Sequence, residues 1–473
     1  MSPSLLQRWK GSSDFFKAQG QVTIILLIAF IGNNWPNSYP RNDNHDPKVF
    51  WIMNAALGVA ALATMRHEPS SQQNKVTLLS RAQTEEWKGW MQWAFIMYHY
   101  YRVYYVYNEI RVFVSAYVWM TGFGNFLYFD KKHDYSLDRM VSMWLRINYF
   151  PIMLSTFVGV PLELYYVVPL HTVGFFVTMA TCWVSRQFEL QLGWNYWPSR
   201  IAGVTISLLV HIAFYETNAK DILLMLGQEG SHEYHFRFQA DKYSAWVGIL
   251  SGMMWKKISD TATSLYASNT PNPLASWTQR LVGSVMMFSW FHMCGNMDKY
   301  TYNPMHPFIF WIPLAGWLLL RNSSKYLTEL HSTVLEFFGR ITLETYVLQF
   351  HVFMCNNVQN IPILIPGSGP DGSDMLKFAN MLLCGVGFVC LALWARKVTV
   401  TTQLTVVELL GLLRNNSTSP PSLPTTKTVL HSTSTVALSD SQHAGKNIDV
   451  IPTEEMSSFI RKNGDVETRK EQV

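Results

Sequence analysis

The stretch Phe338–His351, FGRITLETYVLQFH, decides the fold class of this chain. It lies within an apolar segment, residues 333–354, that is long enough to cross a bilayer, since a helical span needs roughly 20 mostly apolar residues. The segment nevertheless carries Arg340, Glu344 and His351. Charged and imidazole groups are costly in hydrocarbon, so a membrane protein retains them where they pair with one another or line a polar cavity. The stretch therefore predicts a transmembrane helix with a polar side that faces the interior of a bundle.

The three polar residues of this segment fall on one stripe of the predicted helix, because an α-helix has about 3.6 residues per turn. Arg340 and Glu344 are one turn apart and are predicted to neutralise each other. Two interpretations stay open. The stripe is either a structural ion pair with a hydrogen-bonded histidine, or the wall of a buried functional cavity.

Composition and segment count extend this prediction to the whole chain. Of the 473 residues, 49% are hydrophobic and only 15% are charged, against about 25% charged in a typical soluble domain. The 18 Trp and 22 Tyr suit membrane–water interfaces. The predicted fold class is an all-α, polytopic transmembrane helix bundle with about twelve spans. These are residues 21–36, 49–65, 90–107, 111–129, 143–160, 164–183, 201–216, 243–256, 279–295, 307–320, 333–354 and 376–395.

The distribution of Lys and Arg predicts the topology. Loops rich in these residues alternate with poor ones through all twelve spans, which places both termini in the cytosol under the positive-inside rule. Residues 413–473 turn to Ser, Thr, Pro and charge, as in a disordered cytoplasmic tail. We interpret the net charge of +5 as topology, with membrane lipid and not nucleic acid as the surrounding partner. The five cysteines have no paired spacing, so no disulfide framework and no metal site are predicted.

The third span carries a histidine that we expect near mid-membrane. His99 lies in Tyr98-His-Tyr-Tyr-Arg102. It is either a hydrogen-bonded core residue or a functional group, because imidazole can exchange a proton near neutral pH or carry an acyl group. Further polar residues gather on the predicted luminal side, each of them weak evidence alone: His171, His235, Arg237, His292 and His306.

Longer strings of sequence are more specific evidence of function than single residues. The string LLSRAQTEEWKGWMQ, residues 78–92, resembles the start of the ten-helix acyltransferase domain of glycan O-acetyltransferases. That family includes the plant reduced-wall-acetylation proteins, the fungal capsule O-acetyltransferases and the animal sialic-acid O-acetyltransferases. The resemblance continues in order at Arg111–Phe126 (RVFVSAYVWMTGFGNF), Arg146–Asn148, Tyr165–Thr172, Tyr234–Arg237, His306–Pro307 and Gly339–His351. It implies a ten-helix membrane acyltransferase domain at 78–397, preceded by an N-terminal segment, 1–77, with two spans.

The resemblance also implies a function. It predicts a multi-pass Golgi protein that uses cytosolic acetyl-CoA to supply acetyl groups to a luminal polysaccharide or glycan acceptor, as in cell-wall acetylation. Ala82 departs from the family string, which has an acidic residue there. The animal and fungal members also carry a luminal Ser-hydrolase-like domain that this sequence lacks. We therefore expect the plant-type arrangement, which leaves room for a separate luminal Ser-hydrolase-like transferase as a partner.

Candidate roles follow from this expected function. His99 first and His351 second are predicted as base or acyl carrier, with Glu344 orienting a base and His171 as a further catalytic candidate. Arg111, Arg146 and Arg340 are predicted to stabilise a developing oxyanion or to hold the pantetheine–phosphate arm. Arg81 and Lys88 at the cytoplasmic mouth suit the phosphates of acetyl-CoA. One rival is a transporter of an acetyl donor or sugar without chemistry of its own, although the sequence shows no repeat of the kind transporters often have. The other is a scaffold or receptor.

Overall fold

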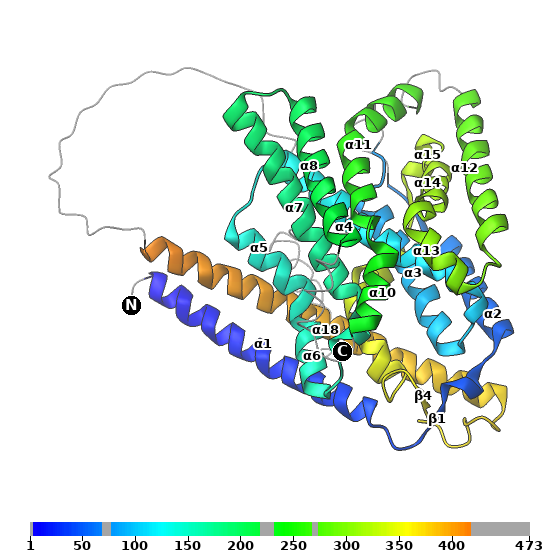
Figure 1. Cartoon of the computed structure of the whole chain (residues 1–473). Coiled ribbons are helices and arrows are strands. Elements are labelled where there is room, and N and C mark those ends of the chain that lie inside the picture. The colour runs from blue at the N-terminus through cyan, green and yellow to red at the C-terminus, as the bar shows by residue number, and fades with distance from the viewer. Residues whose placement is uncertain (1–2, 69–76, 218–230, 267–272, 418–473) are drawn as a thin grey trace, which may run out of the picture. The chain divides into compact units, whose positions relative to one another are not determined.

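The computed structural model describes residues 3–68, 77–217, 231–266 and 273–417, with side chains at all of these except 3–12, 231–235 and 412–417. Helices account for most of the described chain (Figure 1). They are α1 (Pro3–Asn33), α2 (Pro47–Ala63), α3 (Arg81–Tyr101), α4 (Tyr107–Lys132), α5 (Leu137–Trp144), α6 (Phe150–Val158), α7 (Val167–Leu192), α8 (Tyr196–Glu216), α10 (Ser231–Asp241), α11 (Ser244–Tyr266), α12 (Pro273–Cys294), α13 (Lys299–Ile309), α14 (Trp311–Arg321), α15 (Lys325–Thr328), α16 (Thr333–Arg340), α17 (Thr342–Leu348) and α18 (Asp374–Ser417).

Short elements join these helices. The 3-10 turns are η1 (Arg41–Asn44), η2 (Tyr104–Val106) and η4 (Leu162–Tyr165), and the π-helical turns are η3 (Leu145–Tyr149) and η5 (Gln349–Phe353). Two antiparallel ladders, which the sequence did not predict, pair β1 (Ser38–Pro40) with β4 (Asn360–Pro362) and β2 (Met65–His67) with β3 (Leu330–Ser332). Each ladder ties a loop of the N-terminal segment to one near the eleventh expected span.

The predicted fold class is confirmed. Each of the twelve expected spans falls largely on a helix or on a run of consecutive helices. Five helical stretches in the described chain are long and apolar enough to cross a membrane, namely 13–33, 104–132, 167–192, 196–216 and 374–411. The other expected spans form shorter or interrupted helices, and the span expected at 143–160 folds as α5, η3 and α6 in succession.

The N-terminal segment shares a core with the predicted acyltransferase domain. Helix α1 lies alongside α18 (Figure 1), and Val22 and Ile25 pack in one hydrophobic cluster with Phe388 and Leu391. The described chain up to residue 417 belongs to one compact unit, so the expected boundary at residue 77 does not divide two cores. Helix α18 also continues past the predicted end of the last span to Ser417, and the rest of the predicted tail lies outside the described residues.

Two glycines bring α3 and α16 into direct backbone contact. A Cβ on Gly89 would overlap the Leu335 carbonyl oxygen, and one on Gly339 would overlap the carbonyl oxygen of Glu85. Small residues at a helix crossing allow this close approach, which is a common basis of helix association in membranes. Both glycines belong to the strings that carry the resemblance, so part of that signature is a packing requirement.

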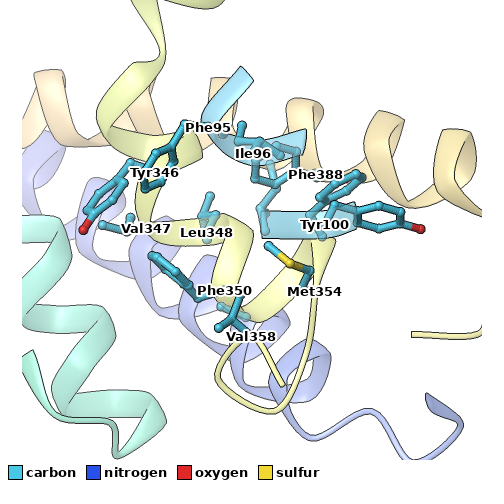
Figure 2. Close-up of a cluster of buried hydrophobic side chains, with 14 of the residues drawn as sticks. Phe95, Ile96, Tyr100, Tyr346, Val347, Leu348, Phe350, Met354, Val358 and Phe388 are labelled. Carbon is cyan, nitrogen blue, oxygen red and sulfur yellow. The ribbon is translucent and has the colours of Figure 1, made fainter. Parts of the chain in front are cut away.

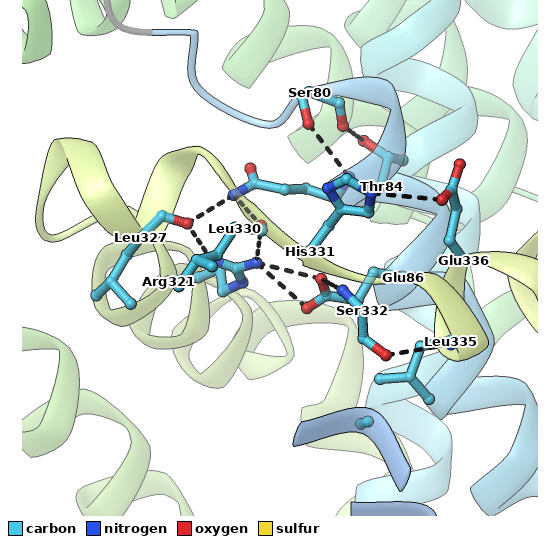
Figure 3. Close-up of polar contacts among 12 residues, drawn as sticks. Ser80, Thr84, Glu86, Arg321, Leu327, Leu330, His331, Ser332, Leu335 and Glu336 are labelled. Atoms are coloured by element: carbon cyan, nitrogen blue, oxygen red, sulfur yellow. Dashed lines mark hydrogen bonds and ion pairs between the residues drawn. The ribbon is translucent and has the colours of Figure 1, made fainter. Parts of the chain in front are cut away.

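Polar contacts near the start of α3 also hold α3 and α16 together (Figure 3). The Glu86 carboxylate accepts from Arg321 Nη2 at 3.2 Å and from the Ser332 backbone amide at 2.8 Å. Arg321 also donates to the backbone carbonyls of Leu327 and Leu330. The start of α3 is thereby tied to the chain between α14 and α16.

The eleventh expected span is not one continuous helix. Helix α16 ends at Arg340, and Ile341 leaves the helical conformation. Helix α17 begins at Thr342 and is followed directly by the π-helical turn η5. Figure 2 shows Tyr346 of this segment beside Phe95 of α3, with 5.8 Å between the ring centroids, and the Phe350 ring lies 5.6 Å from that of Tyr346. π-Helical turns inside helices are frequent at functional sites, and this one contains His351.

Candidate functional site

The predicted ion pair between Arg340 and Glu344 is wrong. The Arg340 side chain is 60% exposed and pairs with Glu336, whereas the Glu344 side chain is fully buried and accepts from Arg146 Nη1 at 2.7 Å. The interruption at Ile341 removes the regular helical register on which the predicted stripe depended. Glu344 Oε2 is buried without a hydrogen-bond partner among the described residues. Arg146 of the turn η3 and Glu344 of α17 form the polar pair inside the bundle.

Arg111 belongs to a second buried network, on α4. Its Nη2 donates to Asp241 Oδ2 at 2.7 Å, and both side chains are almost wholly buried. Ser115 donates to Asp241 Oδ1 at 2.5 Å, because an ionised carboxylate can only accept. His306 Nε2 therefore donates to Ser115 Oγ at 2.6 Å, and its Nδ1 accepts from the Tyr302 hydroxyl at 2.8 Å. The Ser115 proton points at the carboxylate and not at the imidazole, so the arrangement joins helices and does not activate a serine.

The sequence missed three members of this network, Ser115, Asp241 and Tyr302. Ser115 lies one helical turn after Arg111, and that spacing could have suggested a shared face. Asp241 precedes the eighth expected span and carries no local sign of its partner. Arg111 Nε and Nη1 have no hydrogen-bond partner in the described chain.

Two predicted histidines are already engaged. His351 is fully buried, its Nδ1 donates to Asn33 Oδ1 at 2.8 Å, and its Nε2 accepts from the Tyr165 hydroxyl. His171 Nδ1 is hydrogen-bonded to Thr121 Oγ1. His292 lies on the exposed side of α12, and the side chain of His235 is outside those described. Any proton transfer by His351 would first require it to break a hydrogen bond inside the core.

His99 differs from these histidines. It lies in the last turn of α3, is partly exposed, and neither ring nitrogen makes a hydrogen bond to any residue in the described ranges. Aromatic rings surround the imidazole: Phe95 at 4.6 Å, Tyr98 at 5.0 Å and Phe350 at 6.1 Å between ring centroids. The ring is held in place by packing while both nitrogens stay available to another molecule.

Two arginines exert their charge on this ring. The charges of Arg41 and Arg237 both act on His99 and on the neighbouring Tyr98. The Arg237 guanidinium lies 4.4 Å from the centre of the Tyr166 ring. Arg41 was missed by sequence reasoning, because it stands alone in a polar loop between the first two expected spans and has no motif around it. The ladder between β1 and β4, which brings it here, depends on residues 320 positions away.

Arg81 and Lys88, the two residues predicted to bind the coenzyme phosphates at the cytoplasmic mouth, lie on α3 before His99. Arg81 begins that helix and is exposed, and Lys88 Nζ pairs with Glu85 at 2.8 Å. Eighteen residues separate Arg81 from His99, which at 1.5 Å per residue places them about 27 Å apart along the helix. No cluster of three or more His, Cys, Asp or Glu that could hold a metal ion occurs among the described residues.

Comparison with known proteins decides the family. The 10 TM acyl transferase domain found in Cas1p matches residues 10–411. The chain belongs to this family. The match confirms the resemblance inferred from the sequence strings, and it includes α1 and α2 as well as the predicted domain at 78–397. The chain is thus a multi-pass membrane protein with an acyltransferase domain.

A second comparison is with a curated relative of this chain. The N-acetylneuraminate (7)9-O-acetyltransferase of Danio rerio is 29% identical over 398 residues, which cover 79% of this chain and 48% of the relative. The chain therefore spans about half the length of that relative. No solved structure matches the chain.

Proposed function

We propose that this chain is a membrane-bound O-acetyltransferase, or the acetyl-donating component of one, in the Golgi membrane. It would take acetyl groups from cytosolic acetyl-CoA and transfer them to hydroxyls of a luminal polysaccharide or glycan, directly or through a separate luminal transferase. The observation that carries the proposal is the His99 imidazole, which is fixed by aromatic packing, partly exposed and free of hydrogen bonds to the described chain. Family membership and the acetyltransferase relative supply the reaction class.

In this proposal the two ends of α3 have different tasks. Arg81 and Lys88 would hold the phosphates of acetyl-CoA, because Lys and Arg form charge-assisted hydrogen bonds with phosphate oxygens. His99, at the opposite end, would take the proton of the acceptor hydroxyl while the hydroxyl oxygen attacks the thioester carbonyl. The coenzyme A thiolate would then leave and take up a proton from the His99 imidazolium. Alternatively, a His99 ring nitrogen would attack the thioester carbonyl and expel the coenzyme A thiolate, which takes up the proton lost from the ring. The acceptor hydroxyl would then attack the acetyl-imidazole and return its proton to the ring as the C–N bond breaks.

Arginines beside the reacting group would stabilise the negative charge that develops on the carbonyl oxygen. Arg41 and Arg237 suit this role better than the predicted Arg340, because their charges act on His99 whereas Arg340 is exposed and paired with Glu336. Arg111 is paired with Asp241 and Arg146 with Glu344 in the interior. These two arginines would contribute by holding the elements around the site in position.

Purified protein in proteoliposomes tests the proposal against its rivals. Acetyl-CoA labelled in the acetyl group is added outside, with a mixture of oligosaccharide acceptors inside and outside. Label on protein or sugar supports acetyl transfer. Intact labelled acetyl-CoA inside the vesicles, with no labelled product, would indicate a transporter. If neither labelled product nor labelled acetyl-CoA inside the vesicles is found, only the scaffold or receptor interpretation remains, and the proposal is overturned.

A further inference from the structure

We propose that His171 binds the uncharged arm of the donor coenzyme, with its Nε2 accepting a hydrogen bond from an amide of the pantetheine group. The inference rests on the proposed function and adds a stretch of the donor's path. Lys88 would hold the coenzyme phosphates, and eleven residues of α3 separate it from His99, which is about 17 Å at 1.5 Å per residue. The arm must be held across that distance, and the contacts of His171 connect both ends.

Hydrogen bonds along one face of α4 connect Lys88 to His171. The Tyr117 hydroxyl donates to the Lys88 backbone carbonyl at 2.5 Å. Thr121 lies one turn further along α4, on the same face, and its Oγ1 is hydrogen-bonded to His171 Nδ1 at 2.5 Å. The charge of Lys88 also acts on the His171 ring. Two neighbouring residues of α4 therefore join the Lys88 end of α3 to His171 on α7.

The start of α7 reaches the surroundings of His99. Tyr165 lies just before α7, and its ring is 5.9 Å from that of Phe350. The Phe350 ring is also the one that lies 6.1 Å from His99. His171 follows Tyr165 by six residues, which is about 9 Å along a helix. Helix α7 thus leads from the aromatic residues beside His99 to the contacts with Lys88, and His171 lies on it between the two.

The hydrogen bonds of Thr121 determine which nitrogen of His171 is free. The Thr121 hydroxyl has one proton and donates it to the Tyr117 carbonyl at 3.3 Å, a bond that Thr side chains often make one turn back in a helix. The hydroxyl oxygen then accepts from His171 Nδ1, so Nε2 carries the lone pair of the neutral imidazole. Nε2 makes no hydrogen bond to any residue in the described ranges, and the ring is partly exposed. His171 therefore offers an unused hydrogen-bond acceptor whose orientation Thr121 holds.

The surroundings of His171 suit an uncharged ligand that carries N–H groups. One turn further along α7, Gly174 packs against the Ala245 side chain, and neither residue is charged. The charges of Lys88 and Asp241 act on His171 in opposite senses, so they do not select an anion there. The pantetheine arm lies between the phosphates and the sulfur of coenzyme A and contains amides. An amide N–H that leaves water for an apolar interior needs an acceptor, and His171 Nε2 supplies one.

The test measures coenzyme binding without acetyl transfer. Full-length protein in nanodiscs is titrated calorimetrically with coenzyme A and, separately, with its adenosine bisphosphate part, which keeps the charged end and lacks the arm. His171→Ala should raise the Kd of coenzyme A about tenfold, as for the loss of one hydrogen bond, and leave the Kd of the adenosine bisphosphate unchanged. Thr121→Val, which frees the ring to rotate, should also weaken coenzyme A, and Thr121→Ser should restore it. Thr178→Val on α7 is the matched control and should match wild type, because its hydroxyl bonds only the Gly174 carbonyl.

A footprint locates the contact on His171 itself. Diethyl pyrocarbonate modifies unprotonated imidazole nitrogens, and the peptide that contains His171 is followed by mass spectrometry. Coenzyme A should protect His171, pantetheine should do so at higher concentration, and the adenosine bisphosphate should not. The inference is overturned by a His171 that does not react without ligand, by equal protection from the adenosine bisphosphate, or by no protection from coenzyme A. If His171→Ala loses both affinities, it has lost its fold, and a wild-type Kd of coenzyme A in Thr121→Val then overturns the inference.

The His171 site and the proposed function fail separately. Coenzyme A binding that depends on His171, in a protein without acetyl transfer, would keep the site and remove the function. Acetyl transfer with an unchanged KM for acetyl-CoA in His171→Ala would keep the function and remove the site. A lower kcat with that unchanged KM would assign His171 to the chemistry and overturn the binding role, because a binding residue acts on KM.

Discussion

The polar side chains inside this bundle differ chiefly in whether their hydrogen bonds are already used. His351 and His306 each engage both ring nitrogens, whereas His99 engages neither within the described chain. A buried group with its hydrogen bonds satisfied is stable and unreactive, and breaking its contacts costs free energy before any chemistry begins. Availability of the side chain therefore separates a functional histidine from a structural one here.

The buried pair between Arg146 and Glu344 gives a residue-scale prediction. Arg146→Gln leaves the fully buried Glu344 carboxylate without its cation, and removal of one partner of a buried pair costs about 3–5 kcal/mol. We expect a large fall in the thermal unfolding midpoint of the detergent-purified protein. Arg340→Gln is the matched control, because an exposed pair contributes at most about 1 kcal/mol. Equal midpoints for the two variants would show that the Arg146 pair is not what holds this region.

Sequence reasoning identified most of these residues but not their partners. An ionisable group in an apolar segment is visible in the sequence, and Arg111, Arg146, Glu344 and His351 were all found in that way. Their partners come from elements far away in the chain, as when Glu344 meets Arg146 from 198 positions away. Arg340 appeared to be the partner of Glu344 because a regular helix was assumed through Ile341.

At the scale of elements, the close crossing of α3 and α16 makes a second prediction. Gly89→Ala or Gly339→Ala would push a methyl group into a backbone carbonyl, which no side-chain rotation can relieve. Overpacking of this kind costs about 1–3 kcal/mol or more. We expect a lower yield of monodisperse protein in size-exclusion chromatography. The control is Gly20→Ala on α1, where nothing lies within 4 Å of the added carbon. If Gly89→Ala and Gly339→Ala both behaved like Gly20→Ala, the tight crossing would be contradicted.

The positions of the helices were predictable from hydrophobicity, and their interruptions were not. Apolar length marks a span because the bilayer thickness sets it. The π-helical turns at Leu145–Tyr149 and Gln349–Phe353, and the left-handed Arg102 that ends α3, depend on packing with other elements. The two short ladders are also invisible in the sequence, since three-residue strands have no periodicity to detect. Arg41 was missed for this reason, and with it a large part of the His99 site.

At the scale of the whole molecule, the pairing of α1 with α18 predicts the topology. Gln19 of α1 contacts Thr402 in the second half of α18, and Figure 1 shows the start of α1 beside the end of α18. The two helices therefore run antiparallel, so the start of α1 and the end of α18 lie at the same end of the helix pair. Together with the positive-inside pattern this predicts that both termini are cytosolic. In sealed microsomes, protease should remove both an N-terminal and a C-terminal tag. A tag that stays protected until detergent is added would contradict this topology.

The most direct test of the central claim is the specific acetyl-transfer activity of His99→Ala, measured with labelled acetyl-CoA per mole of folded protein. The account predicts near-complete loss of transfer with only a small fall in the unfolding midpoint, because the His99 ring forms no hydrogen bond with the described chain and its removal costs only its packing against neighbouring rings. His292→Ala, at an exposed position on α12, should retain wild-type activity. His351→Ala should lose folded protein and activity together, since its ring joins Asn33 to Tyr165. Wild-type specific activity in His99→Ala would contradict the account.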